Sequence, residues 1–220
     1  MTIGEAQQHG ARSVGVLGGT FDPIHNAHLL LAEQAREQFG LSRVLLLPSA
    51  HPPHKLNDGV TQAEHRYEMV VQAIADHPHF DVSRIELDRA GPSFTITTIR
   101  ELKQAGLGEV YFITGADSIL EMATWREPDS ILAEAHVVAA PRPGFDIARA
   151  REALGPERLA KVRMFDCPLM DISSTEIRRR VATGRSIRYM APDCVAEYVR
   201  RCHLYQGLNA VTRQARSGHC

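Results

Sequence analysis

The sequence lacks several features that would place it in a specialised class of protein. Its 220 residues contain no apolar run approaching the ~20 residues that a membrane-spanning helix needs. Residues 1–12 are polar and contain no apolar signal core. The four cysteines include no C-x-x-C pair, and four in a chain of this length do not indicate a disulfide scaffold. We therefore expect a cytoplasmic protein with reduced thiols and no membrane partner.

The sequence also lacks an excess of charge of either sign. Lys plus Arg number 25 and Asp plus Glu number 26, which gives a formal net charge of −1. Domains that bind nucleic acid are usually strongly basic, so no nucleic-acid partner is expected. Hydrophobic residues make up 44% and charged residues 23%, which is ordinary for a globular protein and excludes a disordered or fibrous class.

Short apolar segments alternate with amphipathic segments along the chain. The patterns predict strands at 13–17, 43–47, 80–83, 85–87, 110–114, 136–140 and 162–165, and helices at 27–39, 63–76, 95–105, 174–183 and 192–201. In the second helix, Tyr67, Val70, Val71 and Ile74 fall on one side. This alternation predicts an α/β, Rossmann-like doubly wound, mostly parallel sheet with helices on both faces and a small helical C-terminal part. In such sheets ligands bind beyond the carboxyl ends of the strands.

The first motif, GGTFDPIHNAH from Gly18 to His28, follows the first strand and opens the first helix. Gly18 and Gly19 let the backbone turn sharply and approach a ligand, and the helix N-terminus offers N–H groups to phosphate. His25 and His28 are three residues apart, so they share one helix face and can donate to phosphoryl oxygens. A plain turn with two surface histidines is one alternative. A zinc pair is another, but no third and fourth ligands appear at suitable spacing.

Two further motifs follow later strands. PSAHPPHK, from Pro48 to Lys55, combines prolines that stiffen a loop with a lysine suited to phosphate, although a solvated lysine is the plainer interpretation of this motif alone. Gly115-Ala116-Asp117 places an acid at the end of the clearest strand, where it can hydrogen-bond a ribose hydroxyl or cap the next helix.

The motif ISSTEIR, from Ile172 to Arg178, has the form of a helix N-cap with an early acid. Its N–H groups, hydroxyls and Arg178 can also hold a polyphosphate tail. Trp125 is the sole tryptophan of the chain, and it is either a core residue or a surface on which a flat aromatic ring stacks.

These motifs carry a resemblance to a known family. G-G-T-F-D-P-I-H-x-x-H and I-S-S-T-x-I-R resemble the two signatures of the nucleotidylyltransferase superfamily and lie about 150 residues apart in the expected order. Three intervening motifs, P-x-x-x-x-P-H-K, G-P-S-F-T-I-T-T and G-A-D followed by Trp, resemble those of bacterial nicotinate mononucleotide adenylyltransferases.

The sequence departs from the family pattern at four positions. Ala27 replaces the usual glycine of H-x-G-H, Phe94 stands for the usual tyrosine, and Thr97 stands for the usual aspartate. Arg126 follows Trp125 where relatives often have an aromatic residue.

The resemblance implies an enzyme of NAD biosynthesis. It would transfer the adenylyl group of ATP to nicotinate mononucleotide, giving nicotinate adenine dinucleotide and pyrophosphate, with Mg²⁺ bound to the ATP phosphates as cofactor and no metal site on the protein. Another phosphate acceptor, such as pantetheine phosphate, glycerol phosphate or choline phosphate, and a nucleotide-binding protein without catalysis stay open as alternatives. The preference for nicotinate over nicotinamide and the oligomeric state, a homo-oligomer included, also stay open.

The resemblance further implies roles for individual residues. Those expected to act in catalysis are His25, His28, Lys55 and Arg178. Those expected to bind ATP are Gly18, Gly19, Thr20, Phe21, His25, His28, Gly115, Asp117, Ile172, Ser173, Ser174 and Arg178. Those expected to bind the mononucleotide are Asp22, Lys55, Thr95, Trp125 and Arg126. The resemblance covers residues 13–205, which we expect to form a single domain with its helical part from about residue 173, and 1–12 and 206–220 are expected to be tails.

Overall fold

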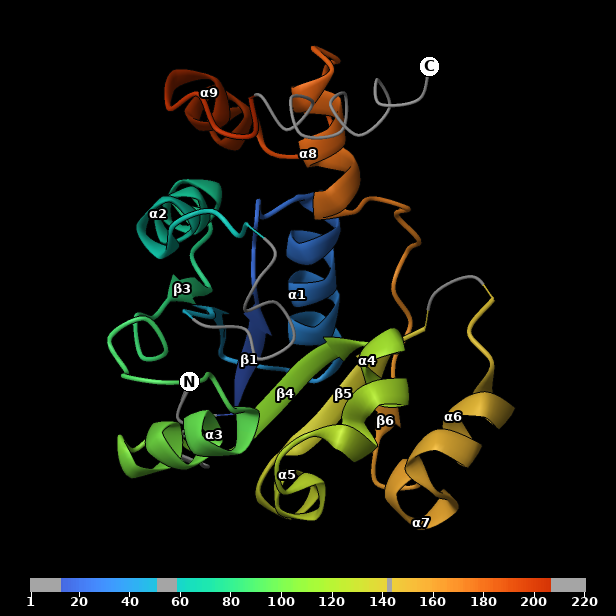
Figure 1. The fold of residues 1–220 in the computed structure, drawn as a ribbon. Coiled ribbons are helices and arrows are strands. Elements are labelled where there is room, and N and C mark those ends of the chain that lie inside the picture. The colour runs from blue at the N-terminus through green and yellow to red at the C-terminus, as the bar shows by residue number, and fades with distance from the viewer. Residues whose placement is uncertain (1–12, 51–58, 142–143, 207–220) are drawn as a thin grey trace, which may run out of the picture.

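The strands of this computed structural model, which describes residues 13–50, 59–141 and 144–206, form one sheet. Six strands lie within those residues in the order β3-β2-β1-β4-β5-β6, and every neighbouring pair is parallel (Figure 1). They are β1 (Val14–Gly19), β2 (Arg43–Pro48), β3 (Phe80–Val82), β4 (Val110–Gly115), β5 (His136–Ala140) and β6 (Arg163–Met164). The order reverses between β1 and β4, which confirms the doubly wound α/β fold that the sequence predicts.

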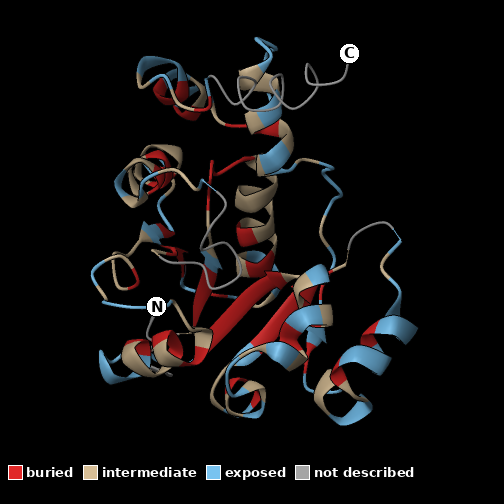
Figure 2. Cartoon of the chain, viewed as in Figure 1, coloured by how far each residue is buried: buried red, intermediate tan, exposed pale blue. Residues whose placement is uncertain are grey.

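Successive side chains of each strand point to opposite faces of the sheet, so they form two separate cores, one on each face. Leu17, Leu46, Ile113 and Val138 belong to one core, and their chain neighbours, such as Val16, belong to the other. The first core packs against α1 (Asn26–Gln38), α2 (Ala63–Ile74), α8 (Ser174–Ala182) and α9 (Asp193–Arg201). The second packs against α3 (Thr95–Gln104), α4 (Asp117–Glu121), α5 (Pro128–Glu134) and α6 (Ile147–Leu154). Figure 2 shows the central strands buried between these two layers.

The sequence patterns do not predict the short helices of the structure. The sequence analysis predicts no helix for α4, η1 (Met122–Thr124), α5, α6 or α7 (Pro156–Leu159), because none is longer than eight residues and so none shows a sustained period. The strand predicted at 85–87 is wrong. Those residues form a turn in which the Asp88 N–H donates to the Arg84 carbonyl at 2.9 Å, and the Glu86 side chain is buried.

The buried face of α2 also differs from the predicted one. Met69, Val70 and Ile74 are buried as part of the first core, whereas Tyr67 is only half-buried. The residue that completes the buried face is Arg66, which is 1% exposed. A charged side chain there means that hydrogen bonds, together with apolar packing, set the rotation of this helix.

Two glycines shape the first βα unit. Gly40 has φ +60 and directly follows the C-cap of α1, as its sequence position predicts. Gly15 lies in β1 where a Cβ atom would come within 2.8 Å of Ile113 Cδ1 and 2.9 Å of Leu41 Cδ1. Glycine at this position therefore leaves room for side chains of β4 and of the connection between α1 and β2. No helix in the described residues is both long and apolar enough to cross a membrane.

Candidate active site

Two cavities open beyond the carboxyl ends of β1 and β4, at the point where the strand order reverses. The larger has a volume of about 450 Å³ and the smaller about 210 Å³. Gly18, Thr114 and Ser118 line both of them. Open α/β sheets bind their ligands at this point, so the structure offers two adjoining compartments for two ligands that meet at a shared wall.

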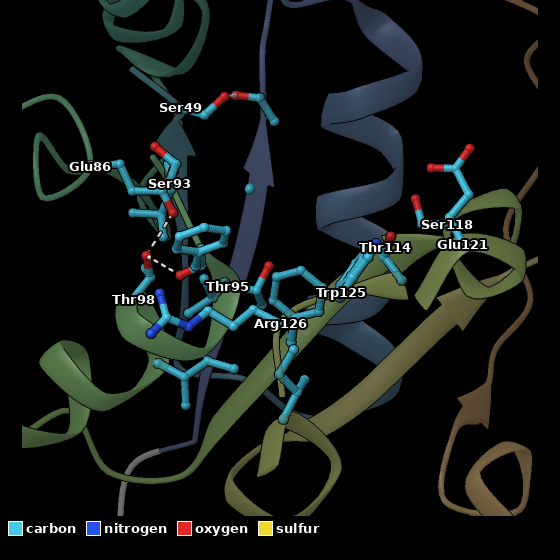
Figure 3. A pocket seen from close by; sticks show the side chains of 18 of the residues that line it. Ser49, Glu86, Ser93, Thr95, Thr98, Thr114, Ser118, Glu121, Trp125 and Arg126 are labelled. Carbon is cyan, nitrogen blue, oxygen red and sulfur yellow. Dashed lines mark hydrogen bonds between the residues drawn. The ribbon is translucent and has the colours of Figure 1, made fainter. Parts of the chain in front are cut away.

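The larger cavity gathers many of the residues that the sequence selects for the mononucleotide and for the glycine turn. Thr95, Trp125 and Arg126 line it together with Gly19 and Thr20 (Figure 3). The Trp125 ring stands at 90° to that of Phe112, with the ring centroids 5.9 Å apart. Polar side chains that the sequence analysis does not select complete the lining; they are Ser49, Glu86, Ser93, Thr98, Thr114, Ser118, Glu121 and Thr124.

The smaller cavity gathers residues predicted to bind ATP. His28, Gly115 and Asp117 line it with Gly18. Asp117 is the first residue of α4 and comes directly after β4 and Ala116. Cys167 and Met170 close the opposite side, and burial raises the pKa of the Cys167 thiol. Neither was selected from the sequence.

The glycine turn is shaped by the ring that packs on it. Phe21 is 2% exposed and has φ +48, in the left-handed region. A Cβ atom at Gly19 would lie 2.9 Å from Phe21 Cε1, so only glycine fits below the ring. A Cβ atom at Gly18 would meet no described atom within 4 Å. The backbone of Gly18 therefore faces open cavity, which is the close approach to a ligand that its sequence predicts.

The two histidines form a stacked pair at the start of α1. His25 is the N-cap of the helix and is 3% exposed, and its ring lies 3.6 Å from the His28 ring at an interplanar angle of 20°. The backbone N–H of His25 donates to His28 Nδ1 at 3.3 Å. A neutral imidazole whose Nδ1 accepts carries its proton on Nε2. The pair thus fixes one tautomer of His28, on the lining of the smaller cavity.

The N-terminus of α8 is fastened to the loop between Phe21 and His25. Ser173 caps the helix by accepting the Glu176 N–H, and Ser174 Oγ donates to the Pro23 carbonyl at 2.9 Å. Arg178 Nη1 donates to the Asp22 carbonyl at 2.7 Å. The N-termini of α1 and α8 therefore meet the same loop, and both helix dipoles favour negative charge near it.

Asp22 lies in a buried polar cluster and not on the lining of either cavity. Its carboxylate accepts hydrogen bonds from Tyr205 Oη at 2.8 Å and from the Thr61 N–H at 3.3 Å. Burial, followed by the charge of Asp22, raises the pKa of Tyr205. Arg178 Nη1 lies 3.9 Å from the second carboxylate oxygen. The structure therefore gives Asp22 a positioning role, and contact with a mononucleotide stays a prediction.

Arg66 joins three loops around the same cluster. Its guanidinium donates to the carbonyl of Thr20 at 2.7 Å, that of Thr61 at 2.8 Å and that of Ala50 at 3.4 Å. Burial lowers the pKa of Arg66, and the charge of Asp22 opposes this effect. Thr20 follows β1 and Ala50 follows β2, so one side chain joins the two segments that leave these paired strands.

A second buried network lies at the far end of the larger cavity. Thr98 Oγ1 donates to Glu86 Oε1 at 2.7 Å (Figure 3). It also accepts from both terminal nitrogens of Arg89 at 3.1 Å. Burial raises the pKa of Glu86, and its hydrogen bond to Thr98 opposes this effect. The hydroxyl of Thr98 thus links the Arg89 guanidinium to the Glu86 carboxyl group on the cavity lining.

The remaining predicted site residues lie outside both linings. Phe21, His25, Ile172, Ser173, Ser174 and Arg178 are on neither lining, and their contacts with ATP stay predictions. Lys55 lies in 51–58, outside the described residues. Besides the polar lining residues named above, the sequence analysis does not select Arg66 or Tyr205, which hold the site from outside both linings. A signal exists for Arg66 alone, since it is spaced three and four residues from Met69 and Val70 on the buried side of α2.

Comparison with known proteins agrees with this geometry. Residues 16–180 match the model of the family described as cytidylyltransferase-like. The chain is 47% identical over 198 residues to a protein of Moorella thermoacetica named "Probable nicotinate-nucleotide adenylyltransferase", a match that covers 88% of this chain and 91% of that protein. A protein of Thermus thermophilus with the same name is 46% identical over 194 residues, covering 88% of this chain and 99% of that protein. The chain therefore belongs to the cytidylyltransferase-like family and, within it, to the nicotinate-nucleotide adenylyltransferases.

Solved structures with low sequence identity share the fold. The Plasmodium falciparum nicotinic acid mononucleotide adenylyltransferase complexed with APC has a TM-score of 0.70 and 18% identity, and the match covers 88% of this chain and 97% of that chain. The same enzyme complexed with NaAD also has a TM-score of 0.70, at 19% identity and with the same coverage.

We expect Arg66→Met to destabilise the protein by about 3 kcal/mol. The change removes the donor to three buried carbonyl groups, and each unsatisfied buried acceptor costs roughly 1–3 kcal/mol, while loss of the buried charge offsets part of this. Arg84→Met is the matched control, because Arg84 forms exposed ion pairs with Glu64 and Asp88 that are worth about 1 kcal/mol or less. Urea unfolding measures both; equal losses in the two variants would contradict the role given to Arg66.

Glu86→Gln should stabilise the protein at neutral pH. Folding raises the pKa of this carboxyl above its ordinary 4.5, so the folded state binds its proton more tightly, and stability falls as pH rises from the unfolded to the folded pKa. Glutamine removes that penalty and can still accept from Thr98. We expect a larger gain in unfolding free energy at pH 7 than at about pH 4. Glu121→Gln, an exposed acid of the same cavity, is the control. A gain confined to low pH would refute this account.

Proposed function

We propose that this protein transfers the adenylyl group of ATP to nicotinate mononucleotide and releases nicotinate adenine dinucleotide and pyrophosphate. The observation that carries the proposal is the pair of cavities that share Gly18, Thr114 and Ser118. A reaction that joins two nucleotides requires two compartments whose reacting ends meet at one place. The names of the relatives supply the identity of the two substrates.

The adenosine of ATP is assigned to the smaller cavity and the mononucleotide to the larger. Asp117 at the end of β4 can accept from a ribose hydroxyl, as acids at strand ends do in doubly wound folds. Trp125 offers the larger cavity an aromatic surface for the pyridine ring, and Thr95 lies at the start of α3 beside it. The α-phosphate of ATP then falls near Gly18, between the two ligands.

The chemistry in this arrangement needs no general base. The attacking oxygen belongs to the phosphate of the mononucleotide, which is already anionic near pH 7 because its second pKa is about 6. It attacks the α-phosphorus, the bond to the bridging oxygen breaks, and pyrophosphate leaves with the electron pair. The protein contributes position and charge stabilisation. His28 Nε2 and the N-terminus of α1 donate to the oxygens that gain charge at the α-phosphate.

The β- and γ-phosphates are assigned to the N-terminus of α8. Its first N–H groups, Ser174 and Arg178 lie next to the loop that leads to His25. Arg178 is held by the Asp22 carbonyl and by Thr175, so its charge is oriented before ATP arrives. Lys55 is proposed to contact phosphate from the loop after β2.

Mg²⁺ is proposed to enter with ATP. In the described part of the chain, no group of three His, Cys, Asp or Glu side chains could hold a metal ion. An ion that is bound by the ATP phosphates and by water, as Mg²⁺ commonly is with nucleotides, needs no such group. Mg²⁺ supplies neutralisation of the charge on the leaving pyrophosphate.

Residues 13–205 are proposed to act as one domain. The hydrogen bond from Tyr205 to Asp22 and that from Asn26 Nδ2 to the Tyr189 carbonyl, at 2.7 Å, fasten the helical C-terminal part to the first βα turn. Use of ATP as a substrate supports a cytoplasmic location.

The substrate assignment is tested by pyrophosphate release with ATP and Mg²⁺. Nicotinate mononucleotide, nicotinamide mononucleotide and pantetheine phosphate are compared at equal concentrations. We expect the highest kcat/KM with nicotinate mononucleotide. Release with pantetheine phosphate alone would replace the substrate assignment and keep the reaction class. ATP binding without release in any reaction would indicate a nucleotide-binding protein.

The role of His28 predicts a loss of turnover without a loss of fold. Asparagine at position 28 can still accept the His25 N–H through its side-chain oxygen but has no group in place of Nε2–H. We expect His28→Asn to lower kcat by ~10²–10³, as removal of one transition-state donor does, with an unchanged melting temperature. His79→Asn, at an exposed histidine before β3, is the control. An ordinary kcat in a folded His28→Asn protein would exclude this role.

A further inference from the structure

One cation lies among the described residues that line the larger cavity. Its described lining contains the acids Glu86 and Glu121 and the cation Arg126. A cavity lined only by those acids would repel an anionic ligand. The Arg126 side chain, 58% exposed, extends from Trp125 toward the part of the lining that carries Thr95 (Figure 3).

The charge of Arg126 is only weakly compensated by its neighbours. Within the described residues its one ion pair is with Glu127, whose Oε1 lies 3.8 Å from Arg126 Nε. The other oxygen of Glu127 accepts from Arg100 at 2.8 Å, and that hydrogen bond lowers the pKa of Glu127. Arg100 divides its hydrogen bonds between Glu127 and Glu134, and Arg126 approaches Glu127 only to 3.8 Å, so the exposed guanidinium of Arg126 can still bind an anion in the cavity.

Two departures from the family pattern meet at this point. The guanidinium carbon of Arg126 lies 4.9 Å from the centroid of the Phe94 ring. Phe94 is also the N-cap of α3, so the guanidinium lies beside the positive end of that helix dipole. An arginine on an aromatic ring keeps its N–H edge open for a planar carboxylate. Arg126, at a position that is often aromatic in relatives, therefore places a guanidinium beside the Phe94 ring and the N-terminus of α3, where it can bind an anion.

We propose that Arg126 is a specificity-determining residue that selects a pyridine ring bearing a carboxylate over one bearing a carboxamide. The inference rests on the proposed function and on the assignment of the ring to Trp125. The neighbouring residue in the chain then reaches the ring substituent. A guanidinium binds a carboxylate with two parallel charge-assisted hydrogen bonds, whereas a carboxamide offers one neutral acceptor and a donor that opposes the guanidinium N–H.

The proposal is tested with Arg126→Gln, Arg126→Lys and, as a control of equal charge change, Arg149→Gln on the exposed face of α6. The readout is the ratio of kcat/KM for nicotinate mononucleotide to that for nicotinamide mononucleotide. Trp125 is the sole tryptophan, so its fluorescence gives Kd for each mononucleotide independently of turnover. We expect Arg126→Gln to lower the ratio about tenfold, through KM and Kd for the nicotinate form alone. Arg126→Lys should retain part of the ratio, because lysine keeps the positive charge but cannot donate two parallel hydrogen bonds to a carboxylate.

The outcomes separate this proposal from the proposed function. An unchanged ratio in Arg126→Gln, in a wild type that prefers nicotinate mononucleotide, would overturn the role of Arg126 and leave the reaction intact. Equal losses with both mononucleotides would also overturn it, because they would indicate a general contribution to the shape of the cavity. A wild-type protein that releases no pyrophosphate with either mononucleotide would overturn the proposed function itself.

Discussion

The site depends on a positive charge that the fold has buried. The Arg66 guanidinium is 1% exposed and is surrounded by carbonyl groups from Thr20, Ala50 and Thr61. An unpaired charge at that depth would cost far more than the fold can supply, so the three loops must stay where their oxygens can accept. The helix that carries Arg66 is thereby locked in rotation, and the ends of β1 and β2 are held at a fixed separation. The hydrogen bond from Arg66 to the Thr20 carbonyl therefore helps to hold the turn that follows Gly18 and Gly19.

The same turn is held from its other side by the C-terminal part of the chain. Arg178 donates to the Asp22 carbonyl, Ser174 to that of Pro23, and Tyr205 to the Asp22 carboxylate. These partners are separated by 151 to 183 residues in the sequence. These polar contacts connect the loop between Phe21 and His25 to the C-terminal part of the chain. Its geometry is therefore a property of the whole fold and not of the loop sequence.

The difference between what the sequence predicts and what it misses has a physical basis. Alternating buried strands and the start of α1 could be predicted, since they depend on local periodicity and on glycine. The placement of Trp125 and Arg126 on one cavity follows once the strand order is known. The spacing of Arg66 from Met69 and Val70 indicates the buried side of α2, but its carbonyl partners at Thr20 and Ala50 could not be predicted, because they come from loops elsewhere in the chain. The sequence analysis wrongly places Glu86 in a strand. The partner of its carboxylate is Thr98, which belongs to another element and is not adjacent in the sequence.

The wall shared by the two cavities has a consequence for how a catalytic cycle ends. In the proposed reaction, each nucleotide occupies one compartment before the chemical step and leaves it independently. The product is a single molecule anchored on both sides of Gly18, Thr114 and Ser118. When one half of the dinucleotide dissociates from its compartment, the half that is still bound keeps it close to the site. The resulting effective concentration favours rebinding. Pyrophosphate has no second anchor of this kind. A site of this shape favours departure of pyrophosphate first, and it ties the pace of turnover to how loosely each compartment holds its half of the dinucleotide.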